Sequence, residues 1–260
     1  MKEMKGHARK GRPSQRLKTL HCLVDAAGSL SCRVKEPFRV GFLLIQRPEW
    51  LHADIRRLKR ELPPRGKSGE YHATEDDSRT KAMIRALLCL NPEPRMIIVE
   101  WRKEVFPESA FLKDKLKIFA DTNPLLASFA VTSSDIFGAA SGTGYSVVEV
   151  IVEATKSDLV SEHRGHRQTL NEVLPVMLER QLRIKPGRPG TATMLKVSTL
   201  RKEDCPILSF VDHWLWAYAR CMDRGDRAAF PEALESRTHV MTPDQFTMPQ
   251  TDPENDELAS

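Results

Sequence analysis

Short apolar, β-branched segments alternate with amphipathic segments along most of this chain, and this alternation limits its fold more than any other feature. Strands are predicted at residues 21–25, 38–46, 96–101, 145–152 and 191–197. Helices are predicted at residues 48–62, 74–90, 111–129, 167–182 and 207–222. The first strand ends in a turn at residues 26–28, and the second strand is placed to form a hairpin with it. The order of elements therefore predicts an α/β fold, with a mixed sheet opened by a β-hairpin and covered by helices.

The start of the second helix has its own local signal. Thr74 is followed three residues later by Asp77, which has the form of a capping box, although Glu or Gln is the more usual partner. We therefore expect Thr74 to cap this helix. The polar loop before it contains Glu70 and His72.

Charge is concentrated at the two ends of the chain. Residues 1–19 hold seven basic side chains and one acidic one, whereas residues 241–260 hold five acidic side chains and no basic one. Both ends are predicted to be disordered, because they have little apolar surface to bury. Residues 20–240 are expected to form a single domain. The basic arm could grip phosphates through counterion release, or it could only aid solubility.

Several classes of protein are excluded or disfavoured. No apolar run is long enough for a membrane span, and the start of the chain does not resemble a signal peptide. The five cysteines are scattered without a C-x-x-C pair, which favours a reducing cytoplasm over a disulfide framework or a zinc site. There is no Walker loop, no G-x-G-x-x-G and no G-x-S-x-G motif. We expect a cytoplasmic protein with no membrane partner.

Three carboxylates are placed where elements of a sheet protein can bring them together. Asp25 ends the first predicted strand, Glu153 follows the fourth, and Asp212 lies in the first turns of the last helix. Carboxylates that converge at the rim of a sheet can hold Mg²⁺ or Mn²⁺, which prefer hard oxygen ligands. Taken singly, each has a plainer explanation: turn chemistry for an Asp at a strand end, or compensation of the helix dipole for an acid early in a helix.

Three ordered segments resemble a known family. Residues 23–28 (L-V-D-A-A-G) are similar to the D-E-S-G opening of the family catalogued as domain of unknown function 3800, and residues 69–73 (G-E-Y-H-A) resemble its E-x-H element. Residues 207–217 resemble its closing L-Q-x-A-D-x-x-A-W-A helix, and residues 220–226 its basic E-R-G-D ending. The resemblance covers about residues 20 to 230 and identifies the chain as a divergent member.

The resemblance implies an RNase-H-like fold and metal-dependent nuclease chemistry on DNA or RNA, in an antiphage or mobile-element setting. It implies metal ligands at Asp25, Glu153 and Asp212, with His72 as a catalytic residue that moves a proton or orients a phosphate. Glu70 is a weaker candidate on the same loop. The cofactor would be Mg²⁺ or Mn²⁺, and a protein partner could come from the same gene cluster.

Two departures from the family pattern leave an alternative open. Ala26 stands where the family has Glu, and Ser209 stands where it has Gln. The chain could therefore be a catalytically degenerate subunit that binds nucleic acid or a partner protein. Basic residues of the first helix could guide a nucleic-acid backbone or form a solvated face; they are Arg56, Arg57, Lys59 and Arg60. Trp214 and Trp216 cannot share one side of a helix, so one of them could serve an interface.

Overall fold

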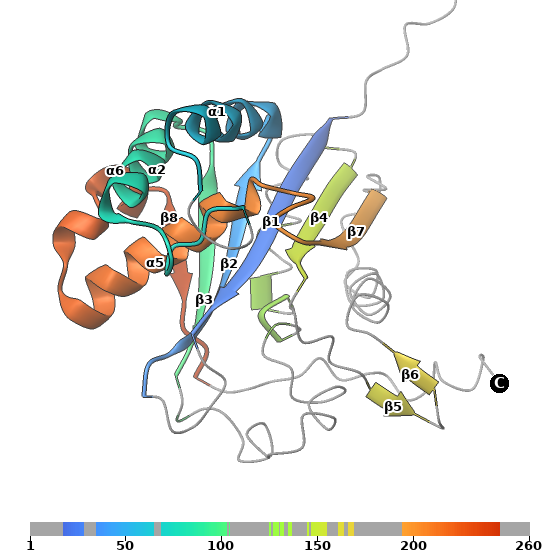
Figure 1. The fold of residues 1–260 in the computed structure, drawn as a ribbon. Helices are drawn as coiled ribbons and strands as arrows, with labels where there is room; N and C mark the ends of the chain where they lie inside the picture. Colours follow the sequence, from blue (N-terminus) through green and yellow to red (C-terminus); the bar gives the residue numbers. More distant parts are fainter. Residues whose placement is uncertain are drawn as a thin grey trace, which may run out of the picture.

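A computed structural model describes most of the predicted domain (Figure 1). The described residues are 18–28, 35–64, 69–102, 104, 125, 127–129, 131–132, 135–136, 145, 147–154, 161–163, 166–168 and 194–244. Their elements are, in chain order, β1 (Thr19–Ala27), β2 (Phe38–Ile45), α1 (Pro48–Glu61), α2 (Ser78–Leu90), β3 (Arg95–Trp101), β4 (Val147–Glu153), β5 (Ser161–His163), β6 (His166–Gln168), β7 (Met194–Leu200), α5 (Leu208–Arg224), η3 (Arg227–Ala229), α6 (Glu232–Glu235) and β8 (Thr238–Met241).

Six of the strands form one mixed sheet in the order β7-β4-β1-β2-β3-β8. β2 is antiparallel to both of its neighbours, β1 and β3, whereas the β1–β4, β4–β7 and β3–β8 pairs are parallel. Thus β2 alone runs against the other five strands of this sheet. The predicted α/β fold, a mixed sheet opened by a β-hairpin and covered by helices, is confirmed.

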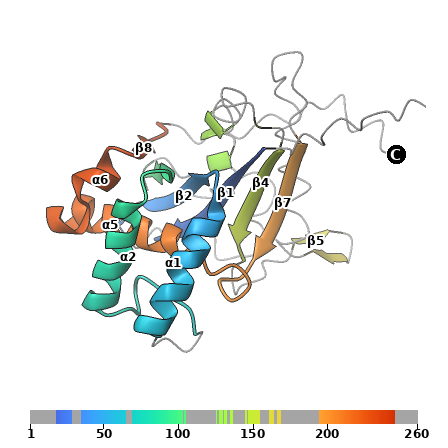
Figure 2. The ribbon, with the colours of Figure 1, turned by 90° about the horizontal axis from the view of Figure 1, so that it is seen from above.

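The two faces of the sheet are buried under different segments. Alternate residues of a strand point to opposite faces, and on β1 Cys22 and Val24 join one apolar cluster while Leu23 joins the other. The Leu23 face is covered by α1, α2 and α5, which lie together on one side of the sheet (Figures 1 and 2). The described helical residues between 125 and 136 pack on the opposite face.

Helix α5 lies close to the strands at a point where the sequence leaves room for it. Asp25 of β1 is paired with Gly41 of β2, and a Cβ at Gly41 would lie 3.0 Å from the side chain of Leu215 on α5. The helix is fixed farther along by Arg39, a buried side chain that donates hydrogen bonds to Glu100 of β3 and to both carboxylate oxygens of Asp223. These contacts set the height of α5 above the sheet, and with it the position of Asp212.

The turn after β1 requires a glycine. Gly28 has a φ of 95°, and a Cβ there would lie 2.6 Å from the carbonyl oxygen of Pro37. We expect Gly28→Ala to lower the free energy of unfolding by about 1–3 kcal/mol, as measured by urea denaturation. Gly69→Ala is the control. Gly69 also has a positive φ, of 70°, but a Cβ placed there would have no atom of the described residues within 4 Å. Equal losses in the two variants would show that the contact with Pro37 adds nothing to the cost of the positive φ.

Most of the predicted elements are present, with two corrections. Helix α2 begins at Ser78 and is capped by Asp77, whose side chain accepts the Thr80 N–H, so the prediction that Thr74 caps it was wrong. Asp is a strong capping residue in its own right, and it needs no partner three residues away. Arg167 and Gln168 belong to β6, not to the start of a helix.

Several other predictions fall partly or wholly outside the described residues. These are the arm at 1–17, the tail from 245 onward, most of the helix at 111–129 and the remainder of the helix at 167–182. At the inner edges of the predicted arm and tail, Thr19 belongs to β1 and Met241 to β8.

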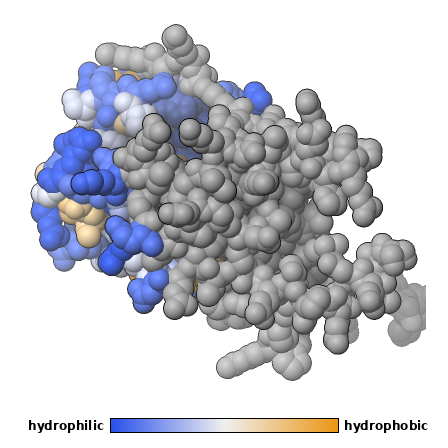
Figure 3. Space-filling model, turned by 90° about the horizontal axis from the view of Figure 1, so that it is seen from below, coloured by the Kyte–Doolittle hydropathy of each residue, from blue (hydrophilic) through white to orange (hydrophobic). Residues whose placement is uncertain are grey.

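The described surface offers little apolar area. Seen from below, its visible part is mainly hydrophilic, with a small apolar area at the edge (Figure 3). The large hydrophobic side chains that are exposed among the described residues are Trp50, Leu90, Met222 and Val240. Within the described residues there is no helix long and apolar enough to cross a membrane.

Candidate active site

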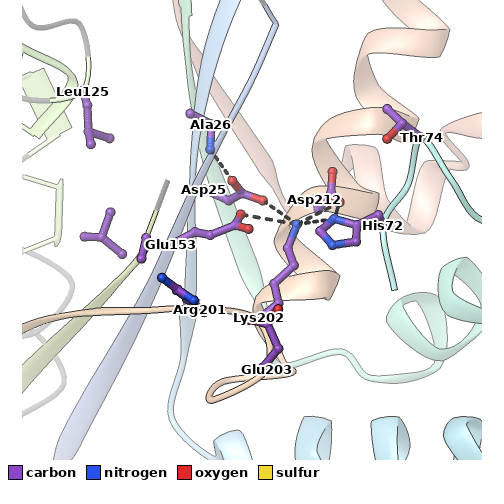
Figure 4. A pocket seen from close by; sticks show the side chains of 12 residues that line it. Asp25, Ala26, His72, Thr74, Leu125, Glu153, Arg201, Lys202, Glu203 and Asp212 are labelled. Carbon is purple, nitrogen blue, oxygen red and sulfur yellow. Dashed lines mark hydrogen bonds and ion pairs between the residues drawn. The ribbon is translucent and has the colours of Figure 1, made fainter. Parts of the chain in front are cut away.

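Three carboxylates from different elements surround one lysine amine at the rim of the sheet (Figure 4). The Lys202 Nζ lies 3.5 Å from Asp25 Oδ2, 3.3 Å from Glu153 Oε2 and 3.0 Å from Asp212 Oδ2. We call Asp25, Glu153 and Asp212 the carboxylate cage. The three carboxylates therefore lie close enough to one another to contact a single ion. Carboxylates more than about 10 Å apart could not do so, because the ligand shell of such an ion has a radius of only about 2.0–2.6 Å.

The parallel strands explain why these groups meet. β1, β4 and β7 are neighbours that run in the same direction, so their C-terminal ends lie at one rim of the sheet. Val24 is paired with Val152, which places Asp25 and Glu153 side by side one residue later. β7 ends at Leu200, and the turn after it delivers Lys202 to the same rim. Asp212 completes the cage from the fifth position of α5.

His72 joins the site through the loop before α2. Its Nδ1 lies 3.3 Å from Lys202 Nζ and 3.7 Å from Asp212 Oδ2. The next residue, Ala73, donates its backbone N–H to Asp212 Oδ2 at 3.0 Å. The His72 carbonyl accepts the N–H groups of Glu75 and Asp76, so residues 72–76 form a closed turn. All four residues predicted for the site, Asp25, His72, Glu153 and Asp212, are therefore brought together.

A buried pair holds the other end of this turn. The Asp76 Oδ2 lies 3.0 Å from His213 Nε2, and both side chains are 3% exposed. His213 Nδ1 lies 2.8 Å from the Ser209 carbonyl oxygen, one helical turn earlier. Asp212 and His213, adjacent on α5, thus contact opposite ends of the turn that carries His72.

Burial and charge act together on the cage. Burial would lower the pKa of Lys202, but Asp25, Asp212 and Glu153 raise it above its ordinary value, so the amine stays positively charged. Burial would raise the pKa of Asp212, but His72 and Lys202 hold it below its ordinary value. Burial and the neighbouring Glu153 raise the pKa of Asp25 well above its usual range. The cage therefore favours more positive charge than one ammonium supplies.

The cage opens onto a cavity of about 640 Å³. Its walls combine the cage and His72 with a basic side chain, Arg201, and with small or apolar residues that include Ala26, Leu125 and Ala154. Arg201 is exposed. A ligand in this cavity would meet carboxylates on one side and a guanidinium beside them.

The structure also locates the other residues that the sequence singled out. Ala26 lines the cavity, so the change from the family's Glu to Ala lies at the wall of the site itself. Ser209 is buried in α5 and does not line the cavity, and Glu70 is buried in an ion pair with Lys59 instead. Lys59 is accordingly engaged by Glu70, and Arg57 forms an exposed ion pair with Glu61. Arg56, Arg57 and Arg60 are exposed.

The two tryptophans of α5 differ in burial, because residues two apart on a helix point in different directions. Trp214 is fully buried and donates its indole N–H to Thr238. Trp216 is only partly buried, with the Lys81 amine 4.8 Å and the Arg220 guanidinium 5.7 Å from its ring centre.

The chemistry of the cage fits a hard divalent cation, although its present geometry fits an ammonium. The Lys202 amine stands in for a cation, and three carboxylates are the oxygen ligands that Mg²⁺ and Mn²⁺ prefer. The oxygens lie 3.0–3.5 Å from the nitrogen, whereas metal–oxygen distances are about 2.0–2.6 Å. Within the described residues, no group of three His, Cys, Asp or Glu side chains is already set to hold a metal. Metal binding would require Lys202 to leave and the cage to contract.

No protein-family model and no curated protein matches this chain. Among solved structures, it is similar to a chain of the PCNA:RNase HII complex from Archaeoglobus fulgidus, at 13% identity and a TM-score of 0.40, with 92% of this chain and 86% of that chain covered. It is also similar to ribonuclease H2 from Pyrococcus horikoshii OT3, at 14% identity and a TM-score of 0.42, with 92% and 84% covered. Likeness at this level carries nothing about the chemistry of this chain.

Proposed function

We propose that this protein is a divalent-cation-dependent nuclease that hydrolyses phosphodiester bonds in DNA or RNA. The observation that carries the proposal is the carboxylate cage, which gathers Asp25, Glu153 and Asp212 around a cation at the opening of a cavity. Membership of the family named domain of unknown function 3800 and an antiphage or mobile-element setting belong to the same proposal through the sequence resemblance. A cytoplasmic location belongs to it through the scattered cysteines.

Each side chain has a role that follows from its position. Asp25, Glu153 and Asp212 would hold Mg²⁺ or Mn²⁺, which when bound activates water and stabilises the leaving oxygen. His72 is held at Nδ1 by Asp212 and Lys202, so its Nε2 is the nitrogen that can exchange a proton with a ligand in the cavity. The neighbouring Asp212 carboxylate raises the pKa of His72, which favours the protonated ring as the proton donor. Arg201 would bind a phosphate at the rim.

A second candidate function is supported by the same lysine. A cage already occupied by the Lys202 amine, beside a position where Ala26 supplies no carboxylate, is also what a degenerate binding subunit would contain. Such a subunit would bind nucleic acid or a partner protein without cleaving it. The two functions differ in one measurable property, because only the nuclease requires a divalent cation.

The test is a cleavage assay on the purified full chain. Single- and double-stranded DNA and RNA are incubated with Mn²⁺, with Mg²⁺ or with EDTA. We expect cleavage with a divalent cation and none with EDTA. The Ala26→Glu variant is assayed in parallel, because it adds a carboxylate at the cavity wall and is expected to tighten metal binding. Absence of cleavage in both proteins under every condition would refute the nuclease and favour the binding subunit.

A further inference from the structure

Lys202 is unusually placed for a lysine. It is 5% exposed, and its amine contacts the three cage carboxylates and His72, whereas lysine is rarely buried without a specific partner. Its backbone is held by a tight turn, in which the Arg201 carbonyl accepts the N–H groups of Asp204 and Cys205. Buried Cys205 and Ile207 anchor that turn to the core. The backbone is therefore fixed, and the flexible part of this residue is its side chain.

The amine occupies the position that a divalent cation would need. A metal bound by Asp25, Glu153 and Asp212 would lie among the same oxygens that now surround the Lys202 nitrogen. If the Lys202 ammonium and a divalent cation shared the cage, they would lie only a few ångströms apart. Their electrostatic repulsion in a buried site would be strong. The adjoining cavity gives the four-carbon side chain a place to move to, and Arg201 already lies in its wall.

We propose that Lys202 and the divalent cation are alternative occupants of the carboxylate cage, so that metal binding expels the lysine amine into the cavity. This inference rests on the proposed metal-dependent function. Once expelled, the ammonium would lie on the cavity side of the cage, where a phosphate group of the substrate would bind. Lys202 thus holds the cage together in the absence of metal and contacts the substrate phosphate in its presence.

The first test measures Mn²⁺ affinity by isothermal titration calorimetry on the full chain and on Lys202→Met. The variant no longer has an amine to expel, so we expect it to bind Mn²⁺ more tightly by roughly tenfold or more, within the range typical of coupled binding events. Lys196→Met is the matched control, because Lys196 is exposed on β7 and outside the cage. Equal or weaker binding by Lys202→Met, or no binding by either protein, would overturn the proposal.

A second measurement uses the unaltered protein. It covers the case in which the Lys202→Met variant does not fold because its three carboxylates lack a positive partner. Lysines are acetylated briefly with and without Mn²⁺, and the modified positions are read by mass spectrometry. We expect Lys202 to be protected without metal and acetylated with it, while Lys196 reacts equally in both. Protection of Lys202 at saturating Mn²⁺ would contradict the exchange.

The two proposals can fail separately. Mn²⁺-dependent cleavage by a protein whose Lys202 stays protected would reject the exchange and keep the nuclease. Exposure of Lys202 by Mn²⁺ without cleavage of any substrate would keep the exchange and reject the nuclease.

Discussion

Replacing Asp212 with asparagine is expected to reduce metal-dependent cleavage by orders of magnitude while leaving the fold nearly intact. Asp212 Oδ2 contacts the Lys202 amine and accepts the Ala73 N–H, so it links the cage to the loop that carries His72. Asparagine has the same shape and an oxygen that can still accept the Ala73 N–H. It removes, however, one of the three negative charges that would hold a divalent cation, and with it a metal ligand. Cleavage rates and thermal unfolding are measured on the same preparation.

Asp204→Asn is the matched control for this experiment. Asp204 lies in the turn between β7 and α5, is exposed and does not line the cavity. The same chemical change there is expected to leave both cleavage and stability unchanged. If Asp212→Asn cleaved as well as Asp204→Asn but unfolded at a lower temperature, Asp212 would be a structural residue of α5 and not a metal ligand.

Removing Asp76 is expected to lower the free energy of unfolding by roughly 1–3 kcal/mol, the usual cost of leaving a buried polar group without a partner. The Asp76 Oδ2 and His213 Nε2 atoms lie close together but outside hydrogen-bond geometry. Asp76 and His213 are both 3% exposed, and the Asp76→Ala variant leaves the imidazole of His213 buried beside a void. The loss is measured by urea denaturation of the full chain. Because this pair holds one end of the turn that carries His72, cleavage should fall as well.

Two comparisons make this prediction specific. Replacing both partners together, with Asp76→Val and His213→Leu, should recover much of the stability, because no unpaired polar group is then buried. Glu61→Ala breaks an exposed pair with Arg57, in which both side chains are 54% exposed, and should have little effect. A loss for Asp76→Ala no larger than that for Glu61→Ala would mean that the buried pair contributes nothing measurable.

Elements with strong local patterns could be predicted from the sequence. The hairpin and helix α1 follow directly from apolar periodicity, and α1 ends before Pro63-Pro64 as expected. Strand β8 was not predicted, because four residues of mixed polarity, Thr238–Met241, have no period of their own. It forms because β3 offers a parallel edge, which is a property of the folded sheet.

The carboxylates of the site could be predicted from the sequence, but the lysine at their centre, Lys202, could not. Asp25 stands near the end of β1, Glu153 ends β4, and Asp212 stands early in α5, which are positions that a rim site requires. Lys202 looked like an ordinary polar residue in a turn, since lysine is usually exposed. One available signal was its place directly after β7, a strand parallel to β1 and β4, but that neighbourhood is known only once the strand order is known.

The buried pair under the site was hidden for a different reason. Asp76 and His213 lie far apart in the chain, and each has a plausible local explanation in a loop or on a helix. Only the packing of α5 against the loop before α2 makes them partners. Pairing of this kind depends on tertiary contacts that no local pattern records.

The central claim, that the carboxylate cage is a divalent-cation site, is tested most directly by anomalous diffraction from crystals soaked in Mn²⁺. We expect an anomalous peak about 2.0–2.6 Å from carboxylate oxygens of Asp25, Glu153 and Asp212, with the Lys202 amine turned into the cavity. A cage without a peak at saturating Mn²⁺, with Lys202 still bound between the three carboxylates, would contradict it.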